Sequence, residues 1–151
     1  MALLAYVMGL VAALCIYYPT TAVELNSLVP VETLWVEQEN GTYIISGKDV
    51  TGSGSNWKTA MDDLEASAEG TVFLETVERI VLSVGATDCM QDMLQDEKLR
   101  PSVQLYYLDG KPNQSLDAFT AAHESDATVQ ECTKIPLIRE TEGRFRFAGT
   151  E

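Results

Sequence analysis

The chain is poor in the residues that most catalytic and nucleic-acid-binding sites need. Its 151 residues include one histidine, three cysteines and ten lysines and arginines, against 23 aspartates and glutamates. One histidine leaves little for a histidine metal site or for histidine acid–base catalysis. Three cysteines cannot form a disulfide-rich scaffold or a paired CxxC zinc site. A formal net charge of −13 repels phosphate backbones, so we expect no nucleic-acid partner.

An apolar segment without any charge opens the sequence. Residues 2–18 read ALLAYVMGLVAALCIYY, and no charged residue precedes Glu24. As a helix this segment would be about 25 Å long, which is short for a bilayer core of roughly 30 Å. A proline follows and would end the helix, and the small residues that end at Ala22 fit a signal-peptide cleavage site. We therefore expect residues 1–22 to be a signal peptide or a membrane-anchor helix, with candidate cleavage after Ala22.

The charged part of the chain, residues 23–151, is expected to be a single extracytoplasmic domain. No basic cluster near the apolar segment would retain it on the cytoplasmic side. Cys15 is a candidate lipid anchor. Leu14 stands where a lipoprotein signal has a small residue, so an ordinary apolar cysteine in the helix is the favoured interpretation. The domain would then be membrane-anchored through the N-terminal helix, or secreted.

Alternating strand-like and helix-like segments fill that domain. The pair Asn40–Gly41 is a strong hairpin signal, residues 52–55 (GSGS) resemble a flexible link, and Asp88 with Gln91 forms a capping-box pattern. Strands are predicted over residues 31–39, 42–51, 77–84, 103–108, 134–139 and 144–147, and helices over residues 56–68, 88–100 and 114–124. The fold class predicted is α+β, a mixed sheet with about three packed helices in the order ββαβαβα–ββ, preceded by the N-terminal hydrophobic helix.

The sequence offers no recognisable catalytic motif. It contains no Walker, GxSxG, HExxH or EF-hand pattern. Asp62, Asp63 and Glu65 lie together on a predicted helix, where a solvated acidic face is the favoured interpretation. His123 ends another predicted helix, where a capping or surface role is favoured. We expect no catalytic residue, no metal ligand and no cofactor; an exported hydrolase that uses carboxylates is the least favoured alternative.

Cys89 and Cys132 are the cysteines of the exported part and form a candidate disulfide. An oxidising compartment permits such a bridge. It would close a loop of 132 − 89 = 43 residues. In the chain-entropy model that closure is worth roughly 4 kcal/mol. The alternative is two unpaired thiols, one of them buried as a small apolar residue.

Three blocks of the sequence resemble the N-terminal domain of the spore germinant receptor C-subunit lipoproteins. The blocks are VELNSLVPVETLWVEQENGTYIIS, GSGSNWKTAMDDLEASAEGTVFLETVERIVLSV and LQDEKLRPSVQLYYLDGKPNQSL, and together they cover about residues 23–120. Members of that family are longer than this sequence. The matching residues are Glu24, Leu25, Leu28, Asn40, Gly41, Tyr43, Ile45, Gly54, Trp57, Ala60, Leu64, Phe73, Ile80, Leu82, Leu99, Arg100, Val103 and Leu105.

The resemblance implies a non-enzymatic, membrane-attached accessory domain that acts in spore germination through protein partners. Integral membrane receptor subunits would be those partners, and the spore inner membrane would be the location. The alternative that stays open is a stand-alone exported interaction or binding domain unrelated to germination.

Overall fold

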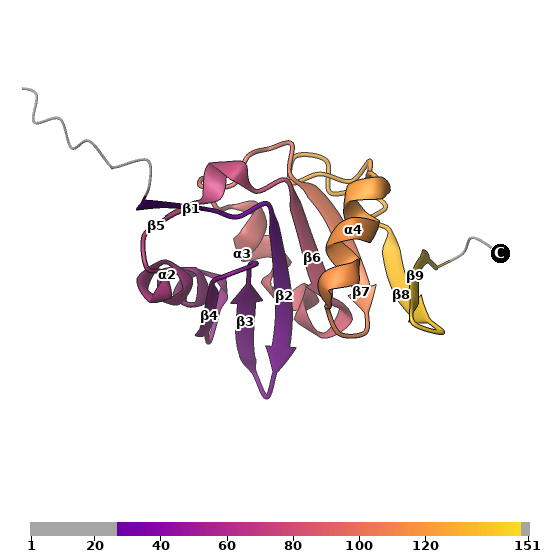
Figure 1. Cartoon of the computed structure of the whole chain (residues 1–151), viewed down its shortest axis with the longest axis horizontal. Helices are drawn as coiled ribbons and strands as arrows, with labels where there is room; N and C mark the ends of the chain where they lie inside the picture. The colour runs from indigo at the N-terminus through magenta and orange to yellow at the C-terminus, as the bar shows by residue number, and fades with distance from the viewer. Residues whose placement is uncertain (1–26, 149–151) are drawn as a thin grey trace, which may run out of the picture.

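A computed structural model describes residues 27–148, which form a seven-stranded sheet with helices on both faces (Figure 1). The central strands β2, β6, β7 and β8 are parallel, and hairpins add antiparallel strands at both edges. In sheet order the strands are β4 (Thr51–Gly54), β3 (Thr42–Ser46), β2 (Thr33–Glu39), β6 (Arg79–Ser83), β7 (Gln104–Asp109), β8 (Leu137–Thr141) and β9 (Arg144–Phe147). A separate parallel pair joins β1 (Leu28–Pro30) to β5 (Thr71–Phe73).

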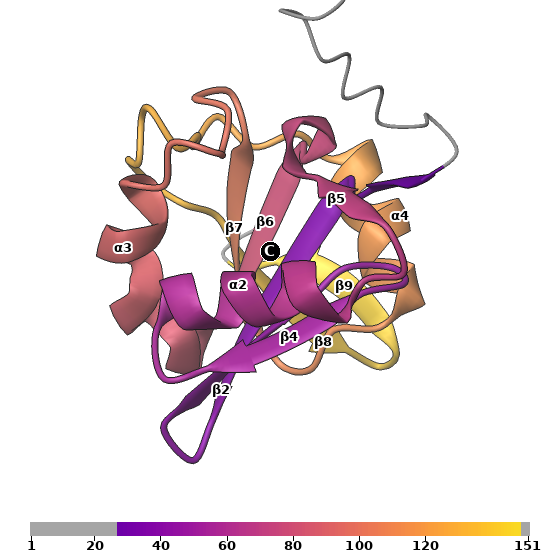
Figure 2. The ribbon, with the colours of Figure 1, turned by 90° about the vertical axis from the view of Figure 1, so that its left-hand side faces the viewer.

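Three α-helices cover the sheet. α2 (Trp57–Ser67) and α3 (Met90–Leu94) pack on one face, and α4 (Gln114–Ala122) packs on the other. Figure 2 shows α3 and α4 on opposite sides of β6 and β7. The prediction of a mixed α+β fold with three helices is confirmed for this part of the chain. The predicted N-terminal hydrophobic helix lies outside the described residues.

Local sequence signals explain several of these elements. Asn40 and Gly41 both have positive φ, 51° and 80°, as a two-residue hairpin turn between β2 and β3 requires. Asn56 caps α2, because its side chain accepts a hydrogen bond from the backbone of Thr59 while the Thr59 hydroxyl accepts one from the backbone of Asn56. Asn113 caps α4 in a similar way through Ser115.

Two predictions about local structure are wrong. Residues 42–51 are not one strand and residues 52–55 are not a link, because the chain turns after β3 and pairs again as β4. Glycine at position 52 lets α2 lie directly on β4, since a Cβ there would sit 2.2 Å from the backbone nitrogen of Leu64. The short strands β1 and β5 were not predicted.

The start of α3 also differs from its prediction. Asp88 does not cap this helix, because residues Val84–Cys89 already form a 3-10 helix that runs into it. The residue in the N-cap position is Cys89, which has helical backbone angles and makes no side-chain capping bond. The helical turn before α3 therefore leaves no exposed helix start for a carboxylate to cap.

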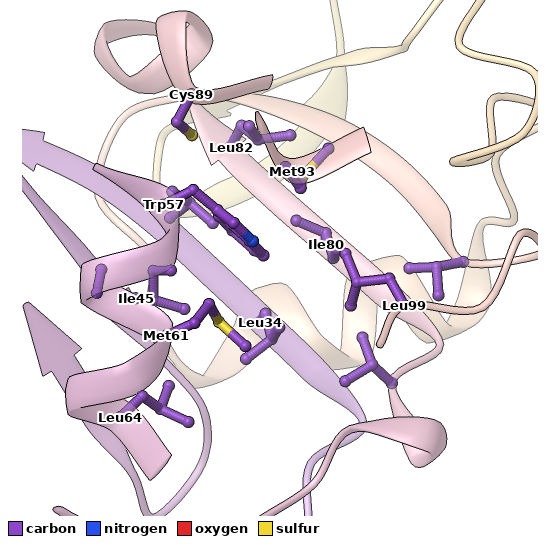
Figure 3. Close-up of a cluster of buried hydrophobic side chains, with 14 of the residues drawn as sticks. Leu34, Ile45, Trp57, Met61, Leu64, Ile80, Leu82, Cys89, Met93 and Leu99 are labelled. Atoms are coloured by element: carbon purple, nitrogen blue, oxygen red, sulfur yellow. The ribbon is translucent and has the colours of Figure 1, made fainter. Parts of the chain in front are cut away.

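Strand alternation divides the apolar residues between two cores. The face under α2 and α3 is filled by large apolar side chains that point toward one another (Figure 3), among them Leu34, Ile45, Trp57, Leu64 and Ile80. The core of the opposite face is smaller. It is formed by Val81, Tyr106, Leu108, Leu116, Ile138 and Phe145.

Candidate functional site

A charged pocket of about 480 Å³ opens beside α4, at the N-terminal ends of β2 and β6. We call it the α4 pocket. Its lining comes from four parts of the chain. Two residues of α4 in the lining, Ala118 and Ala121, have small side chains that occupy little of the pocket. The polar lining residues are Glu32, Thr33, Lys48, Asp49, Arg79 and Asp117.

The sheet and α4 bring these side chains together. Thr33 and Arg79 are register partners at the start of β2 and β6. Their sequence neighbours Leu34 and Ile80 belong to the α2–α3 core, so alternation turns Thr33 and Arg79 to the α4 face. Asp117 lies one helical turn before Ala121, so the two share a side of α4. Lys48 and Asp49, in the β3–β4 connection, complete the lining.

Two cations line the α4 pocket, Lys48 and Arg79, and Arg79 is the more buried of the two. Its side chain is 13 % exposed, and its Nε donates a hydrogen bond of 3.3 Å to Thr33 Oγ1. Its Nη2 lies 3.8 Å from a Glu32 carboxylate oxygen and 3.6 Å from a Glu78 oxygen. Both glutamate side chains are mostly exposed, and exposed ion pairs of this length contribute little. The guanidinium is thus held in place but only weakly neutralised.

Asp117 presents the opposite charge. Its Oδ1 is buried, yet it accepts no hydrogen bond from any residue between 27 and 148. A buried acceptor without a donor costs about 1–3 kcal/mol. Trp35 Nε1, also on the α4 face, is the other buried side-chain polar atom without a partner in the described part. The α4 face therefore contains polar groups that folding has not satisfied.

The hydroxyl of one buried tyrosine, Tyr106, makes several hydrogen bonds on the α4 face. The hydroxyl of Tyr106 lies 2.7 Å from Gln104 Oε1 and 2.9 Å from the carbonyl oxygen of His123. Burial raises the pKa of Tyr106, and the nearby Arg79 opposes that rise. The phenol is therefore a neutral hydrogen-bond donor that ties the end of α4 to β7.

Three further pockets lie away from α4, and two of them involve residues discussed above. The larger, of about 930 Å³, lies between β5 and residues 97–101, with the Lys98–Glu65 ion pair at its rim. The second, of about 500 Å³, lies between α2 and α3, where Trp57 Nε1 donates a 2.8 Å hydrogen bond to Asp96. Between residues 27 and 148 no three histidine, cysteine or carboxylate side chains are grouped so that they could hold a metal ion.

The predicted acidic residues of α2 do not converge on one site. Asp63 accepts a 2.8 Å hydrogen bond from the backbone of Ser53, and Glu65 pairs with Lys98, whose pKa that hydrogen bond raises. Asp62 lines the pocket between α2 and α3. Each carboxylate thus faces a different neighbour, and the three do not form an acid–base pair.

His123 occupies the C-cap position of α4. Its Nδ1 lies 2.9 Å from the carbonyl oxygen of Phe119, and its ring stacks on the Phe119 ring at 4.4 Å. The Phe147 ring meets it edge-on at 5.8 Å. The imidazole is therefore engaged in packing at the end of the helix.

The structure has Cys89 and Cys132 as free thiols, so the disulfide stays a prediction. Cys89 Sγ lies 3.1 Å from the carbonyl oxygen of Ala86, and burial raises the pKa of this thiol to about 11. Cys132 Sγ lies 3.5 Å from the sulfur of Met90, the residue after Cys89. Cys15 and the candidate cleavage site after Ala22 lie outside the described residues.

Sequence patterns did not predict the polar residues of the α4 pocket. A usable signal for Arg79 is its place at the start of the apolar run IVLSV, where a charged side chain enters a central strand. Asp117 and Lys48 gave no comparable signal, because acidic helix positions and basic turn positions are common. Their importance comes from the fold, which places both in the lining of the same pocket as Arg79.

Comparisons with family models, with curated proteins and with solved structures find no match to this chain. No helix between residues 27 and 148 is both long and apolar enough to span a bilayer.

Proposed function

We propose that the chain is a non-enzymatic, membrane-attached extracytoplasmic domain that acts through contacts with other molecules. The observation that carries this proposal is the state of the reactive side chains. His123 is engaged in ring packing, and the α2 carboxylates have separate partners. The α4 pocket combines charges of both signs without a thiol or an imidazole among its lining residues. Such a lining suits recognition better than bond cleavage.

Membrane attachment rests on the apolar residues 2–18 and on the acidic domain that follows them. The segment would serve as an anchor or a signal peptide, with Cys15 as a candidate lipid site and Ala22 as the candidate cleavage position. The acidic domain lacks the basic flank that would hold it in the cytoplasm.

Spore germination is the process that the sequence resemblance suggests. In that case the partners are integral membrane receptor subunits and the location is the spore inner membrane. The alternative is a stand-alone exported interaction domain with no role in germination. A neighbouring gene for a multi-span, permease-like protein favours the germination role. Cross-linking of the full chain in spore membranes, followed by identification of the captured proteins, separates the two.

A protease test on intact protoplasts checks the location. The full chain, tagged at its C-terminus and expressed in a Gram-positive host, should sediment with membranes and lose its domain to added protease. A variant without residues 2–18 should stay inside and be protected. A full-length domain that resists the protease in intact protoplasts contradicts the proposal. The mass of the mature N-terminus then separates cleavage after Ala22, lipid on Cys15 and an uncleaved anchor.

A further inference from the structure

The α4 pocket is lined by groups of opposite charge, and we propose that it binds a small zwitterion. The ligand class is a molecule with one carboxylate and one ammonium group separated by a short carbon chain. The pocket volume of about 480 Å³ falls within the range of roughly 300–1,000 Å³ that is typical of small-molecule sites. This inference goes beyond the proposed function, because contact with a protein partner requires no enclosed charged pocket.

The guanidinium of Arg79 is the group that receives the carboxylate. Its Nε is fixed by Thr33 Oγ1, which orients the planar fork. A fork of this kind binds a carboxylate through two parallel hydrogen bonds. The exposed Glu32 and Glu78 approach only to 3.8 Å and 3.6 Å, so both can swing into water when a ligand carboxylate enters.

The carboxylate of Asp117, a residue that lines the pocket, is the group that receives the ammonium. No described residue donates a hydrogen bond to its Oδ1. Arg79 does not fill this role, because its ion pairs in the described part go to Glu32 and Glu78. An ammonium group beside the Asp117 carboxylate forms a charge-assisted hydrogen bond, which is about twice as strong as a neutral one. Asp49 adds a second carboxylate to the lining, and Lys48 adds a second cation.

Charge balance favours a zwitterion over a simple ion. A free anion meets three carboxylates in the lining, Glu32, Asp49 and Asp117, and a chain with a net charge of −13. A free cation meets Arg79 and Lys48. A zwitterion has no net charge, so it meets no long-range repulsion. Its two charges pair with the cations and with the carboxylates of the lining.

Calorimetric titration of the full chain in detergent micelles tests the proposal. The zwitterionic probes are glycine, β-alanine and 4-aminobutyrate, which place the two charges at increasing separation. Propionate and ethylamine each carry only one of the charges. At least one zwitterion should bind, and should bind at least about tenfold more tightly than either singly charged probe. Binding by none of the three zwitterions, or equal binding of propionate or ethylamine, overturns the proposal.

Matched variants locate the binding. Ala121→Leu fills the α4 pocket from an exposed helix position, whereas Ala122→Leu adds the same volume at the next, equally exposed position. Asp117→Asn removes the charge of the half-buried pocket carboxylate, and Asp126→Asn removes an exposed charge. We expect Ala121→Leu and Asp117→Asn to weaken the best zwitterion about tenfold or more, and the two controls to leave it unchanged. Unchanged binding in Ala121→Leu and Asp117→Asn overturns the assignment to this pocket.

Discussion

The two faces of the seven-stranded sheet are built differently. Under α2 and α3 the sheet is covered by a large apolar core, and the buried indole of Trp57 has a carboxylate partner in Asp96. Under α4 the apolar core is smaller, and it lies beside a pocket of charged residues. The α4 face also holds two buried polar atoms, on Trp35 and Asp117, that have no partner among residues 27–148.

This difference separates stability from recognition within one small domain. An apolar core with satisfied polar groups contributes most of the folding free energy. Buried polar atoms without partners work against folding, and binding sites are places where such atoms occur. We therefore expect substitutions on the α2–α3 face to change stability strongly, and substitutions in the α4 pocket to change binding more than stability.

The largest effect is expected at the contact between α2 and β4. Gly52→Ala places a Cβ 2.2 Å from the backbone nitrogen of Leu64 and 2.4 Å from the carbonyl oxygen of Ala60. Backbone atoms cannot rotate away, so α2 has to move off the sheet, at a cost of about 3 kcal/mol or more. Urea unfolding followed by circular dichroism measures this loss. Gly85→Ala is the control, because no neighbouring atom lies within 4 Å of its new Cβ.

The same substitution on the two faces tests the comparison more finely. Trp57→Phe removes the donor to Asp96 from a side chain that is 2 % exposed, and we expect a loss of about 2 kcal/mol. Trp35→Phe removes an indole N–H that has no partner in the described part, so we expect a loss below about 1 kcal/mol. Equal losses in the two variants would contradict the proposed difference between the faces.

Removal of the pocket carboxylate should barely change stability. Asp117→Ala relieves a buried acceptor without a donor, which favours folding by about 1–3 kcal/mol. It also removes a negative charge from the first turn of α4, which costs roughly 0.3–1 kcal/mol. The variant should therefore be as stable as the parent chain, or up to about 2 kcal/mol more stable, in thermal unfolding. A clear loss of stability would mean that Asp117 has a structural role.

The smallest effect concerns the thiols, and it appears only at alkaline pH. Burial favours the neutral form of Cys89 and raises its pKa from 9.0 to about 11. The stabilisation from this neutral thiol is complete below pH 9 and is lost as the pH rises through about 11. Between these values the stability of the parent chain should fall faster than that of Cys89→Ala. Parallel curves for the two proteins would show that Cys89 is not protected from ionisation.

At pH 8 iodoacetamide should modify the half-buried Cys132 well before Cys89. Mass spectrometry of the digested protein follows both sites. If neither thiol reacts in the exported protein until a reductant is added, the cysteines form the predicted disulfide.

Much of the fold could be predicted from local signals. Asn40–Gly41, the Asn56 cap and the apolar run of β6 act within a few residues, so the hairpin, α2 and a central strand followed directly. The glycines of β4 were misleading, because glycine disfavours strands unless another backbone approaches closely. Here α2 makes that approach, and a contact between distant residues is not visible in local sequence.

The candidate site could not be predicted for a related reason. Lys48, Arg79 and Asp117 are far apart along the chain and become neighbours only when β2 pairs with β6 and α4 crosses their face. Strand alternation predicts which way Arg79 points once the strand is known, but not that α4 lies above it. Sequence reasoning looked instead at the adjacent carboxylates of α2, which the helix turns toward different partners.

The most direct test of the central claim is a two-dimensional NMR titration of the full chain in micelles with the tightest of the three zwitterions. We expect the amide shifts to change around Thr33, Arg79 and Asp117 to Ala121, with the arginine side-chain signal of Arg79 moving as well. The amide shifts of residues in α2 and α3 should not change. Shifts centred on α2 and α3, or no shifts at millimolar ligand, would contradict the assignment of recognition to the α4 face.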